Sequence, residues 1–338
     1  MQILDYTSRF RLCSRYLPLF LDQRAKMAPS AISTPTGTQK SIFPELNGTS
    51  NLNGQSGVVH IPRPTTNDRL PNRYTNGHAC ASALSDGSPD EILDLLCAGF
   101  GPASLAIAIA LHDAQKSCSS APPKVLFMEK QPRFAWHAGM QLPGAKMQIS
   151  FLKDLATPRD PTSRFTFLNY LFQNGRLNHF INLSTFLPTR VEYEDYLRWC
   201  ASHFEKEGKV AYDTEVEGVH IGHQSSSGKV TNFSVTARTS AGELVTRKAR
   251  HVVIAVGGRP LIPRNLQGLK HVAHSSQFAN SIGAIQEREA GRPLRFAVVG
   301  SGQSAAEIFN DLWERFPDAD VKLIIKGASL RPSDDSPL

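Results

Sequence analysis

Residues 92–129 show a pattern of apolar runs and glycine turns that predicts a strand, a helix and a second strand. The run at 92–98 is almost continuously apolar and ends at Gly99, which is typical of a strand buried in a parallel sheet. Small and aliphatic residues over 102–115 predict the helix, and 124–129 predicts the second strand. This order of elements begins an α/β fold with a parallel sheet.

A second helix is predicted between Thr189 and Gly208. Thr189 and Glu192 have the spacing of a capping box, and Gly208 supplies a stop. Apolar side chains recur on one face of this helix: Tyr193, Leu197, Cys200 and Phe204. The segments after it predict a small antiparallel β-meander that closes on a buried strand at its end. These segments are 209–212, 216–221, 232–238, 244–248 and 251–256.

A further strand–helix–strand unit is predicted near the end of the sequence. Residues 294–299 and 321–326 predict strands, and 303–316 predicts the helix between them, which Pro317 ends. This helix is expected to bury Ala305, Ile308, Phe309, Leu312 and Phe316.

The composition is that of a globular protein and limits the function classes. The chain has 338 residues, 41% of them hydrophobic and 20% charged, with a formal net charge of +7. No apolar run reaches the roughly 18 residues that span a bilayer, so no membrane segment is expected. The basic residues are dispersed, which argues against nucleic acid and favours small anions such as nucleotide phosphates. The cysteines are scattered without a C-x-x-C pair, which gives no zinc or redox-disulfide signature and fits a reducing compartment: Cys13, Cys80, Cys97, Cys118 and Cys200.

The first 89 residues differ from the rest of the chain. From 29 to 89 the sequence is rich in Ser, Thr, Asn, Gly and Pro, so it buries too little surface to offset its ordering entropy, and we expect disorder. Residues 1–27 are basic and somewhat apolar, which leaves a targeting segment open. Asp5 and Asp22 favour an upstream extension instead, with Met27 as the functional start and a cytoplasmic location.

Two glycine turns, at 99–104 and 300–305, each follow a predicted strand and open a predicted helix, as a dinucleotide-binding fingerprint requires. The first glycine makes the tight turn, the second lets the backbone approach a pyrophosphate, and the third position needs a small residue. One such turn is often only a connection, but two in complete units indicate two dinucleotide sites, each with a helix N-terminus toward the phosphates. The positions are Gly99, Gly101 and Ser104 in the first turn and Gly300, Gly302 and Ala305 in the second.

The residue that ends each second strand distinguishes the two sites. Glu129 is a carboxylate suited to a ribose diol, so the first site is expected to take FAD. Lys326 is a cation suited to a ribose 2′-phosphate, so the second site is expected to prefer NADPH. Ordinary surface charge remains the alternative for each residue.

Five segments carry a family resemblance that is more specific than the glycine turns. Through them, residues 91–338 resemble the flavin-dependent N-hydroxylating monooxygenases, specifically the fungal L-ornithine N5-monooxygenases of hydroxamate siderophore synthesis. The segments are 127–137, 147–155, 165–199, 300–309 and 331–337. The resemblance implies two Rossmann-like domains of an FAD/NAD(P)-binding flavoprotein: an extension at 1–89, an FAD-binding domain with the meander at 90–290, and a partial NADPH-binding domain at 291–338.

The resemblance also implies site residues. Residues 129–137 would line the FAD site, including Lys130, with Trp136 and His137 near the isoalloxazine. Gln148 would sit close to the flavin and the nicotinamide as the catalytic residue, and Lys153 would pair with the substrate carboxylate. From the residues alone, Trp136 could equally be core, His137 a surface histidine and Lys153 a solvated side chain. Further cofactor contacts implied are Val216 on the adenine side of FAD, Ser301, Gly302, Gln303 and Ser304 on NADPH, and Lys326, where the family often has arginine.

The implied reaction is NADPH- and O2-dependent hydroxylation of the side-chain amine of L-ornithine through a flavin C4a-hydroperoxide, in an enzyme that tends to form homotetramers. The family pattern continues beyond 336–337 with an Asn-bearing loop and a terminal A-T-G-Y strand, so we expect a C-terminally truncated chain. Lysine N6-hydroxylases and Baeyer–Villiger enzymes are the alternatives on the same fold, and a non-catalytic remnant is the alternative of another class. A disulfide reductase would need a redox cysteine pair, which the sequence lacks.

Overall fold

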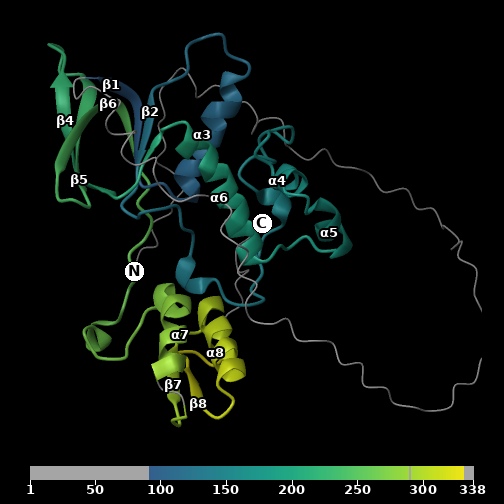
Figure 1. Ribbon diagram of the computed structural model, residues 1–338. Helices are drawn as coiled ribbons and strands as arrows, with labels where there is room; N and C mark the ends of the chain where they lie inside the picture. Colours follow the sequence, from purple (N-terminus) through teal and green to yellow (C-terminus); the bar gives the residue numbers. More distant parts are fainter. Residues whose placement is uncertain (1–90, 289–290, 331–338) are drawn as a thin grey trace, which may run out of the picture. The chain divides into compact units, whose positions relative to one another are not determined.

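The computed structural model describes residues 91–288 and 291–330. The predicted extension at 1–89 and the motif at 331–337 lie outside these residues. The larger sheet has six strands in the order β3-β2-β1-β6-β5-β4 (Figure 1). β1 is parallel to β2 and β6, β2 is parallel to β3, and β4, β5 and β6 form an antiparallel meander. The strands are β1 (Ile92–Ala98), β2 (Val125–Met128), β3 (Val210–Ala211), β4 (Thr214–Gln224), β5 (Val230–Thr239) and β6 (Leu244–Ile254).

The second half of strand β1, residues 95–98, is buried on both faces, as its continuous apolar run predicts. Leu95 and Cys97 belong to the core cluster that holds the helical residues. Leu96 points to the opposite face, where it packs in a second cluster with Val235 and Ala249 of the meander. Because successive side chains of a strand point to opposite faces of the sheet, this one apolar run contributes side chains to both clusters.

Two long helices, α3 (Pro102–Gln115) and α6 (Arg190–Lys206), contact each other and pack beside the larger sheet (Figure 1). The predicted cap of α6 is confirmed, because Thr189 Oγ1 accepts the N–H of Glu192 at 3.2 Å. The reciprocal half of the capping box is absent, since the Glu192 carboxylate pairs with Arg176 instead. Shorter helices lie between these two in the sequence: η1 (Ala138–Met140), η2 (Phe151–Lys153), α4 (Phe167–Gln173) and α5 (Leu177–Asn182).

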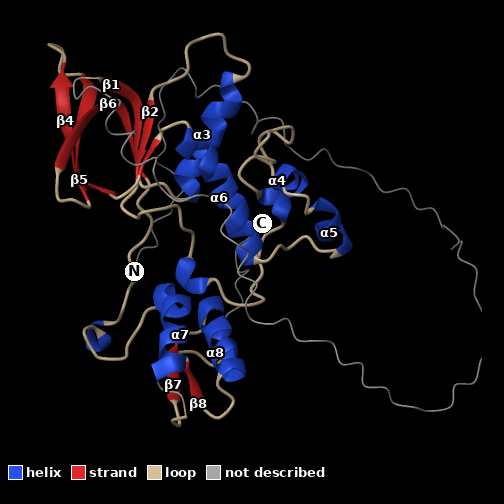
Figure 2. Ribbon diagram, viewed as in Figure 1, coloured by secondary structure: helices blue, strands red, loops and turns tan. Residues whose placement is uncertain are grey.

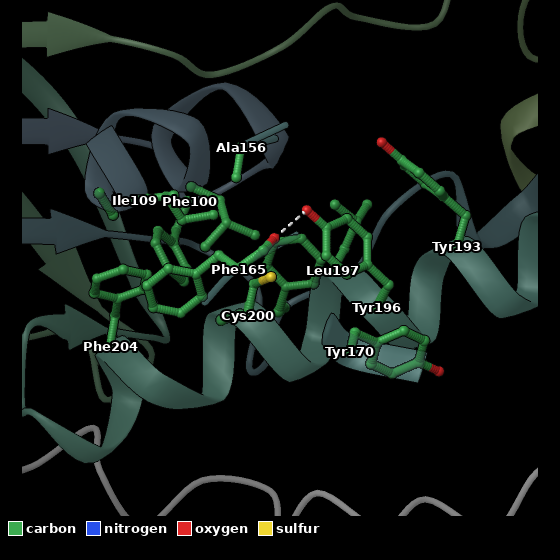
Figure 3. Packing of buried hydrophobic residues seen from close by; sticks show 14 of the residues in the cluster. Phe100, Ile109, Ala156, Phe165, Tyr170, Tyr193, Tyr196, Leu197, Cys200 and Phe204 are labelled. Carbon is green, nitrogen blue, oxygen red and sulfur yellow. Dashed lines mark hydrogen bonds between the residues drawn. The ribbon is translucent and has the colours of Figure 1, made fainter. Parts of the chain in front are cut away.

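The main core is rich in aromatic side chains, and Tyr196 is fully buried in it (Figure 3). The Tyr196 hydroxyl donates to the carbonyl of Phe165 at 2.8 Å and accepts the N–H of Leu155 at 3.2 Å. These two bonds tie α6 to the loop between η2 and α4. The face predicted for α6 is buried in full, with Tyr193, Leu197, Cys200 and Phe204 all in this core.

The second unit has two parallel strands with helices against them (Figure 2). Its cluster contains Val298 together with Ala305, Ile308 and Leu312 of the crossover helix, and Phe309 and Phe316 are partly buried there. Ile282 of the preceding helix also packs in this cluster. The elements are η3 (Arg264–Leu266), η4 (Ser275–Gln277), α7 (Phe278–Arg288), β7 (Arg295–Val299), α8 (Gln303–Arg315) and β8 (Asp320–Ile324).

The structure corrects three predictions about the strands. The segment 244–248 and the residues 251–254 belong to one strand, β6, whose first half pairs antiparallel with β5 and whose second half pairs parallel with β1. The end of the predicted segment 251–256 is not buried, since Ile254 is 61% and Val256 66% exposed. An apolar run does not specify what packs over it. Lys326 lies beyond β8, because the pairing with β7 ends at Ile324.

Candidate functional site

The first glycine turn joins β1 to α3 through a residue that has to be glycine. Gly99 has φ +95°, and a Cβ there would lie 2.4 Å from the carbonyl oxygen of Ala255. The Gly99 N–H donates to the carbonyl of Met128 at 2.8 Å, which fixes the turn against the end of β2. Ser104, fully buried, donates from Oγ to the Gly99 carbonyl at 2.7 Å. The serine therefore closes the turn by a hydrogen bond as well as by its small size.

The Glu129 carboxylate is held beside this turn. Its Oε2 accepts the N–H of Phe100 at 2.8 Å, and its Oε1 accepts the N–H of Gln131 at 2.9 Å. The backbone of Glu129 is bonded on both sides, to Ala211 and Thr214. Each carboxylate oxygen retains a free lone pair, which is what a ribose diol needs as an acceptor.

The second glycine turn repeats this construction between β7 and α8. The Gly300 N–H donates to the carbonyl of Ile324 at 3.0 Å, and Ala305, at the third position, is buried. Gln303 and Ser304 are exposed in the first turn of α8. Ser301 is half-buried, and Lys326 is exposed two residues past β8.

Both turns have open space where a dinucleotide pyrophosphate would approach. Gly101 and Gly302 are the N-cap residues of α3 and α8, and a Cβ at either would meet nothing within 4 Å. Neither helix has an acidic residue in its first turn. The positive end of each helix is thus uncompensated, so the residues present fit a bound diphosphate.

The segment after β2 holds the predicted flavin neighbours. The Trp136 ring is half-buried against the main core, and its centroid lies 5.0 Å from that of the His137 ring and 5.7 Å from that of Tyr193. His137 has φ +46°, in the left-handed region, and its carbonyl accepts the N–H of Met140. Partial desolvation and the neighbouring Arg190 cation lower the pKa of His137, which favours the neutral imidazole.

Gln148 and Lys153 lie on a segment that is tied down on both sides. The N–H groups of Met147 and Phe151 donate to the carbonyls of Pro188 and Phe186, at 2.8 and 2.9 Å. Both predicted site residues expose their side chains. Lys153 ends η2, whose N-cap Ser150 accepts the N–H of Leu152.

Only some of the predicted site residues contact one another. Glu129 is joined to the first turn, and Trp136 contacts His137. Across 91–288 and 291–330, no hydrogen bond, ion pair or ring contact links Gln148, Lys153 or Val216 to either glycine turn. Lys130 is exposed, and Val216 is half-buried against the second core.

Two features of the site were not predicted. The buried Asp154 carboxylate, next to Lys153, accepts the N–H groups of Ala156, Thr157 and Phe167. Arg190 forms a bidentate ion pair with Glu307, 117 residues away. A single Asp gives a weak sequence signal for a turn, and an ion pair between residues so far apart in the sequence gives none.

Of the described cysteines, Cys118 is exposed and its hydrogen bond to Ser120 lowers the pKa of its thiol, while Cys97 and Cys200 are buried. The described cysteines are unpaired, and burial raises the pKa of the Cys97 thiol to about 12 and that of Cys200 well above its ordinary value. Within the same part of the chain, no cluster of His, Cys, Asp or Glu could hold a metal ion. Among the helices described there, none is both long and apolar enough to cross a membrane.

Comparisons with known proteins agree with this geometry. The model of the L-lysine 6-monooxygenase/L-ornithine 5-monooxygenase family matches residues 91–338. An L-ornithine N(5)-monooxygenase of Cochliobolus heterostrophus is 54% identical over 261 residues, which are 73% of this chain and 48% of that protein. The chain spans about half the length of the curated relatives it matches.

Solved structures show the same relationship. The ornithine hydroxylase of Pseudomonas aeruginosa matches with a TM-score of 0.65 and 40% identity, over 73% of this chain and 58% of that one. The ornithine N-hydroxylase of Kutzneria, described with reduced FAD, NADP+ and L-ornithine, matches with a TM-score of 0.65 and 38% identity, over 73% and 56% of the two chains. The α/β fold of an FAD/NAD(P)-binding flavin monooxygenase is thus shown, and the chain belongs to the L-lysine 6-monooxygenase/L-ornithine 5-monooxygenase family.

Proposed function

We propose that this chain carries the cofactor sites of an NADPH- and O2-dependent L-ornithine N5-monooxygenase. The proposal rests on the two glycine turns. Each turn is hydrogen-bonded to the end of a neighbouring strand and has free space at the N-cap glycine of the following helix. The relatives of the chain are named for ornithine hydroxylation. The product, N5-hydroxyornithine, would serve as the hydroxamate precursor of a siderophore.

The first turn would hold FAD, which when bound supplies hydride acceptance from NADPH and the activation of O2. Gly101 would leave room for the pyrophosphate at the start of α3. Glu129 would accept hydrogen bonds from the ribose hydroxyls while the N–H of Phe100 keeps it in place. Trp136, His137 and Lys130 would line the same site, with Val216 on its adenine side.

The second turn would hold NADPH. Gly302 would leave room for the pyrophosphate, and Ser301, Gln303 and Ser304 would supply hydrogen bonds at the start of α8. Lys326 would attract the ribose 2′-phosphate. Because an ammonium group lacks the planar fork of a guanidinium, the preference for NADPH over NADH would be modest.

The segment with Gln148 and Lys153 would receive the substrate. The Lys153 ammonium group would pair with the α-carboxylate of ornithine and so orient the side-chain amine, which reacts only when neutral. Gln148 would donate or accept a hydrogen bond beside the reacting amine. The chain's task in this scheme is orientation and exclusion of water, since no side-chain nucleophile is needed.

The remaining expectations about organisation belong to the same proposal. The FAD-binding domain would occupy 90–290, the NADPH-binding domain 291–338, and the extension 1–89. The protein would work in the cytoplasm as a homo-oligomer, a tetramer by family resemblance.

Hydroxylamine formation by the full-length protein, with FAD and NADPH, tests the proposal. Ornithine should yield the hydroxylated product and lysine should not. Lys153→Met should raise KM for ornithine at least tenfold, about one charge-assisted bond, and leave FAD affinity unchanged. Lys229→Met, in the exposed turn between β4 and β5, is the matched control and should change neither value. Preferential hydroxylation of lysine, or an unchanged KM in Lys153→Met, would overturn the assignment.

A further inference from the structure

Arg190 and Glu307 form a bidentate ion pair although 117 residues separate them in the sequence. Arg190 Nη1 donates to Glu307 Oε2 at 2.6 Å, and Nη2 donates to Oε1 at 2.8 Å. The two side chains are only 15% and 16% exposed. A planar, partly buried pair of this kind fixes orientation as well as distance.

Arg190 is anchored to the segment that follows the predicted flavin neighbours. Its Nη1 also donates to the carbonyl of Met140 at 3.2 Å, and its backbone N–H donates to the carbonyl of Ala145 at 2.8 Å. Met140 is in turn bonded to the carbonyl of His137. The guanidinium therefore moves with the segment 137–145 and with the start of α6.

Glu307 is anchored to the second glycine turn. Its Oε1 accepts from Nε2 of Gln303 at 2.7 Å, and Gln303 is the first residue of α8, directly after Gly302. The Glu307 carboxylate therefore bonds both to the Gln303 side chain, beside the second glycine turn, and to the Arg190 guanidinium. Met140 and Leu142 pack in the same apolar cluster as Ala305 and Ile308, so apolar packing joins the same two segments as the ion pair.

We propose that Arg190 and Glu307 are positioning residues that set the second glycine turn against the segment 137–145, so that a nicotinamide held by the turn reaches a flavin held beside that segment. This inference rests on the proposed function for its chemistry. Its structural part, the coupling of two segments through one ion pair, is independent of any cofactor.

Hydrogen–deuterium exchange of the chain without added cofactor tests the structural part. Glu307→Gln keeps an acceptor for Gln303 but loses the charge and the bidentate geometry. It should speed exchange of the Met140 and Arg190 amides about tenfold. Glu314→Gln is the matched control on the same helix, since the Glu314 carboxylate bonds within α8, to Asn310, and it should leave these amides unchanged. Faster exchange confined to α8 in Glu307→Gln would overturn the inference.

The rate of flavin reduction by NADPH tests the positioning role. Glu307→Gln should lower the limiting rate of reduction by about ten- to a hundredfold, the range expected from a small misplacement of the reacting groups. The half-saturating NADPH concentration should change less than about threefold. Arg190→Ala should have the same effect on the limiting rate, and the double variant should be no slower than either single variant. Additive losses, or a change in affinity alone, would contradict the pair acting as a unit.

These outcomes separate the inference from the proposed function. A protein that binds no FAD would overturn the proposed function, while the exchange experiment would still decide the coupling. Normal flavin reduction in Glu307→Gln would overturn the positioning role and leave the proposed function standing.

Discussion

The backbone N–H of Phe100 donates to Glu129 Oε2 at 2.8 Å, so the first glycine turn and the carboxylate after β2 hold each other in place. The two residues are 29 positions apart and meet because β1 and β2 are parallel neighbours. The carboxylate therefore lies beside the start of α3. At this place the carboxylate can bind the ribose of an adenosine diphosphate while the N-terminus of α3 binds its phosphates.

The two glycines of the first turn should respond differently to alanine. Gly99→Ala forces a Cβ to 2.4 Å from the Ala255 carbonyl oxygen and should destabilise the fold by at least about 2 kcal/mol. Gly101→Ala meets open space, so stability should change by less than about 1 kcal/mol, while FAD affinity should fall more than tenfold because the Cβ occupies the phosphate approach. Urea unfolding and flavin-fluorescence titration measure the two effects. Equal effects of both variants on stability would show that Gly101 is needed for packing.

Asp154 should position Lys153 without touching substrate. Asp154→Asn replaces an oxygen that accepts the N–H of Phe167 and the hydroxyl of Thr157 with an amide donor, so unfolding free energy should fall by about 2 kcal/mol. KM for ornithine should rise more than kcat falls, because the loop that carries Lys153 loses its anchor. Asp160→Asn is the control, since the Asp160 carboxylate bonds to Thr162 in an exposed turn. Urea unfolding and steady-state kinetics of both variants measure these effects. An unchanged KM in Asp154→Asn would refute the positioning role of Asp154.

Stability should depend on His203 at mildly acidic pH. Burial against Phe165 and Phe204 lowers the pKa of His203 below its ordinary value of 6.5, and Arg164, His112 and Lys209 act in the same direction while Glu207 opposes them. The unfolded chain then binds the proton more readily than the folded one. The contribution of His203 to the unfolding free energy is therefore fully present above pH 6.5 and is lost as the pH drops from 6.5 toward the lowered folded pKa.

Replacement of this histidine should flatten that dependence. Urea unfolding between about pH 7.5 and pH 5 should show a smaller fall in stability for His203→Gln than for the parent. His223→Gln, at an exposed position of β4, is the control and should retain the parental slope. Identical slopes for all three proteins would show that other groups cause the acid sensitivity.

Lys326 should set the choice of nicotinamide cofactor. Lys326→Ala should reduce the ratio of kcat/KM for NADPH over NADH roughly tenfold, about the value of one charge-assisted bond at an exposed site. Lys326→Arg should raise this ratio, because a guanidinium can bind the 2′-phosphate through two parallel bonds. Steady-state kinetics with both cofactors measure it, and Lys322→Ala on β8 is the control. A ratio that is unaffected in Lys326→Ala would place the 2′-phosphate elsewhere.

The fold follows from the sequence wherever local pattern and burial agree. The limits of β1 and α3 coincide with the prediction, and the predicted cap at Thr189 is confirmed. Helix α7 was not predicted, because its burial depends on Ile282 meeting a cluster built from distant residues. β6 was divided in the prediction since its two halves pair with different neighbours.

The sequence predicts the motifs of the candidate site but not the contacts that join them. The glycine turns and Glu129 could be found because each lies at a fixed offset from a predicted strand. The bond from Ser104 to Gly99, the anchor at Asp154 and the Arg190–Glu307 pair depend on chain segments that tertiary packing brings together, and no periodicity encodes them. The functional assignment of Gln148 and Lys153 comes from resemblance, and their roles stay predictions.

In the proposed reaction, one oxygen atom of O2 is transferred to the side-chain nitrogen of ornithine. This transfer is tested by measuring the mass of the product after turnover in isotopically labelled O2, with FAD and NADPH. We expect N5-hydroxyornithine that carries one labelled oxygen atom, formed in proportion to the NADPH consumed. Consumption of NADPH with no label in ornithine, or label in lysine when both amino acids are supplied, would contradict it.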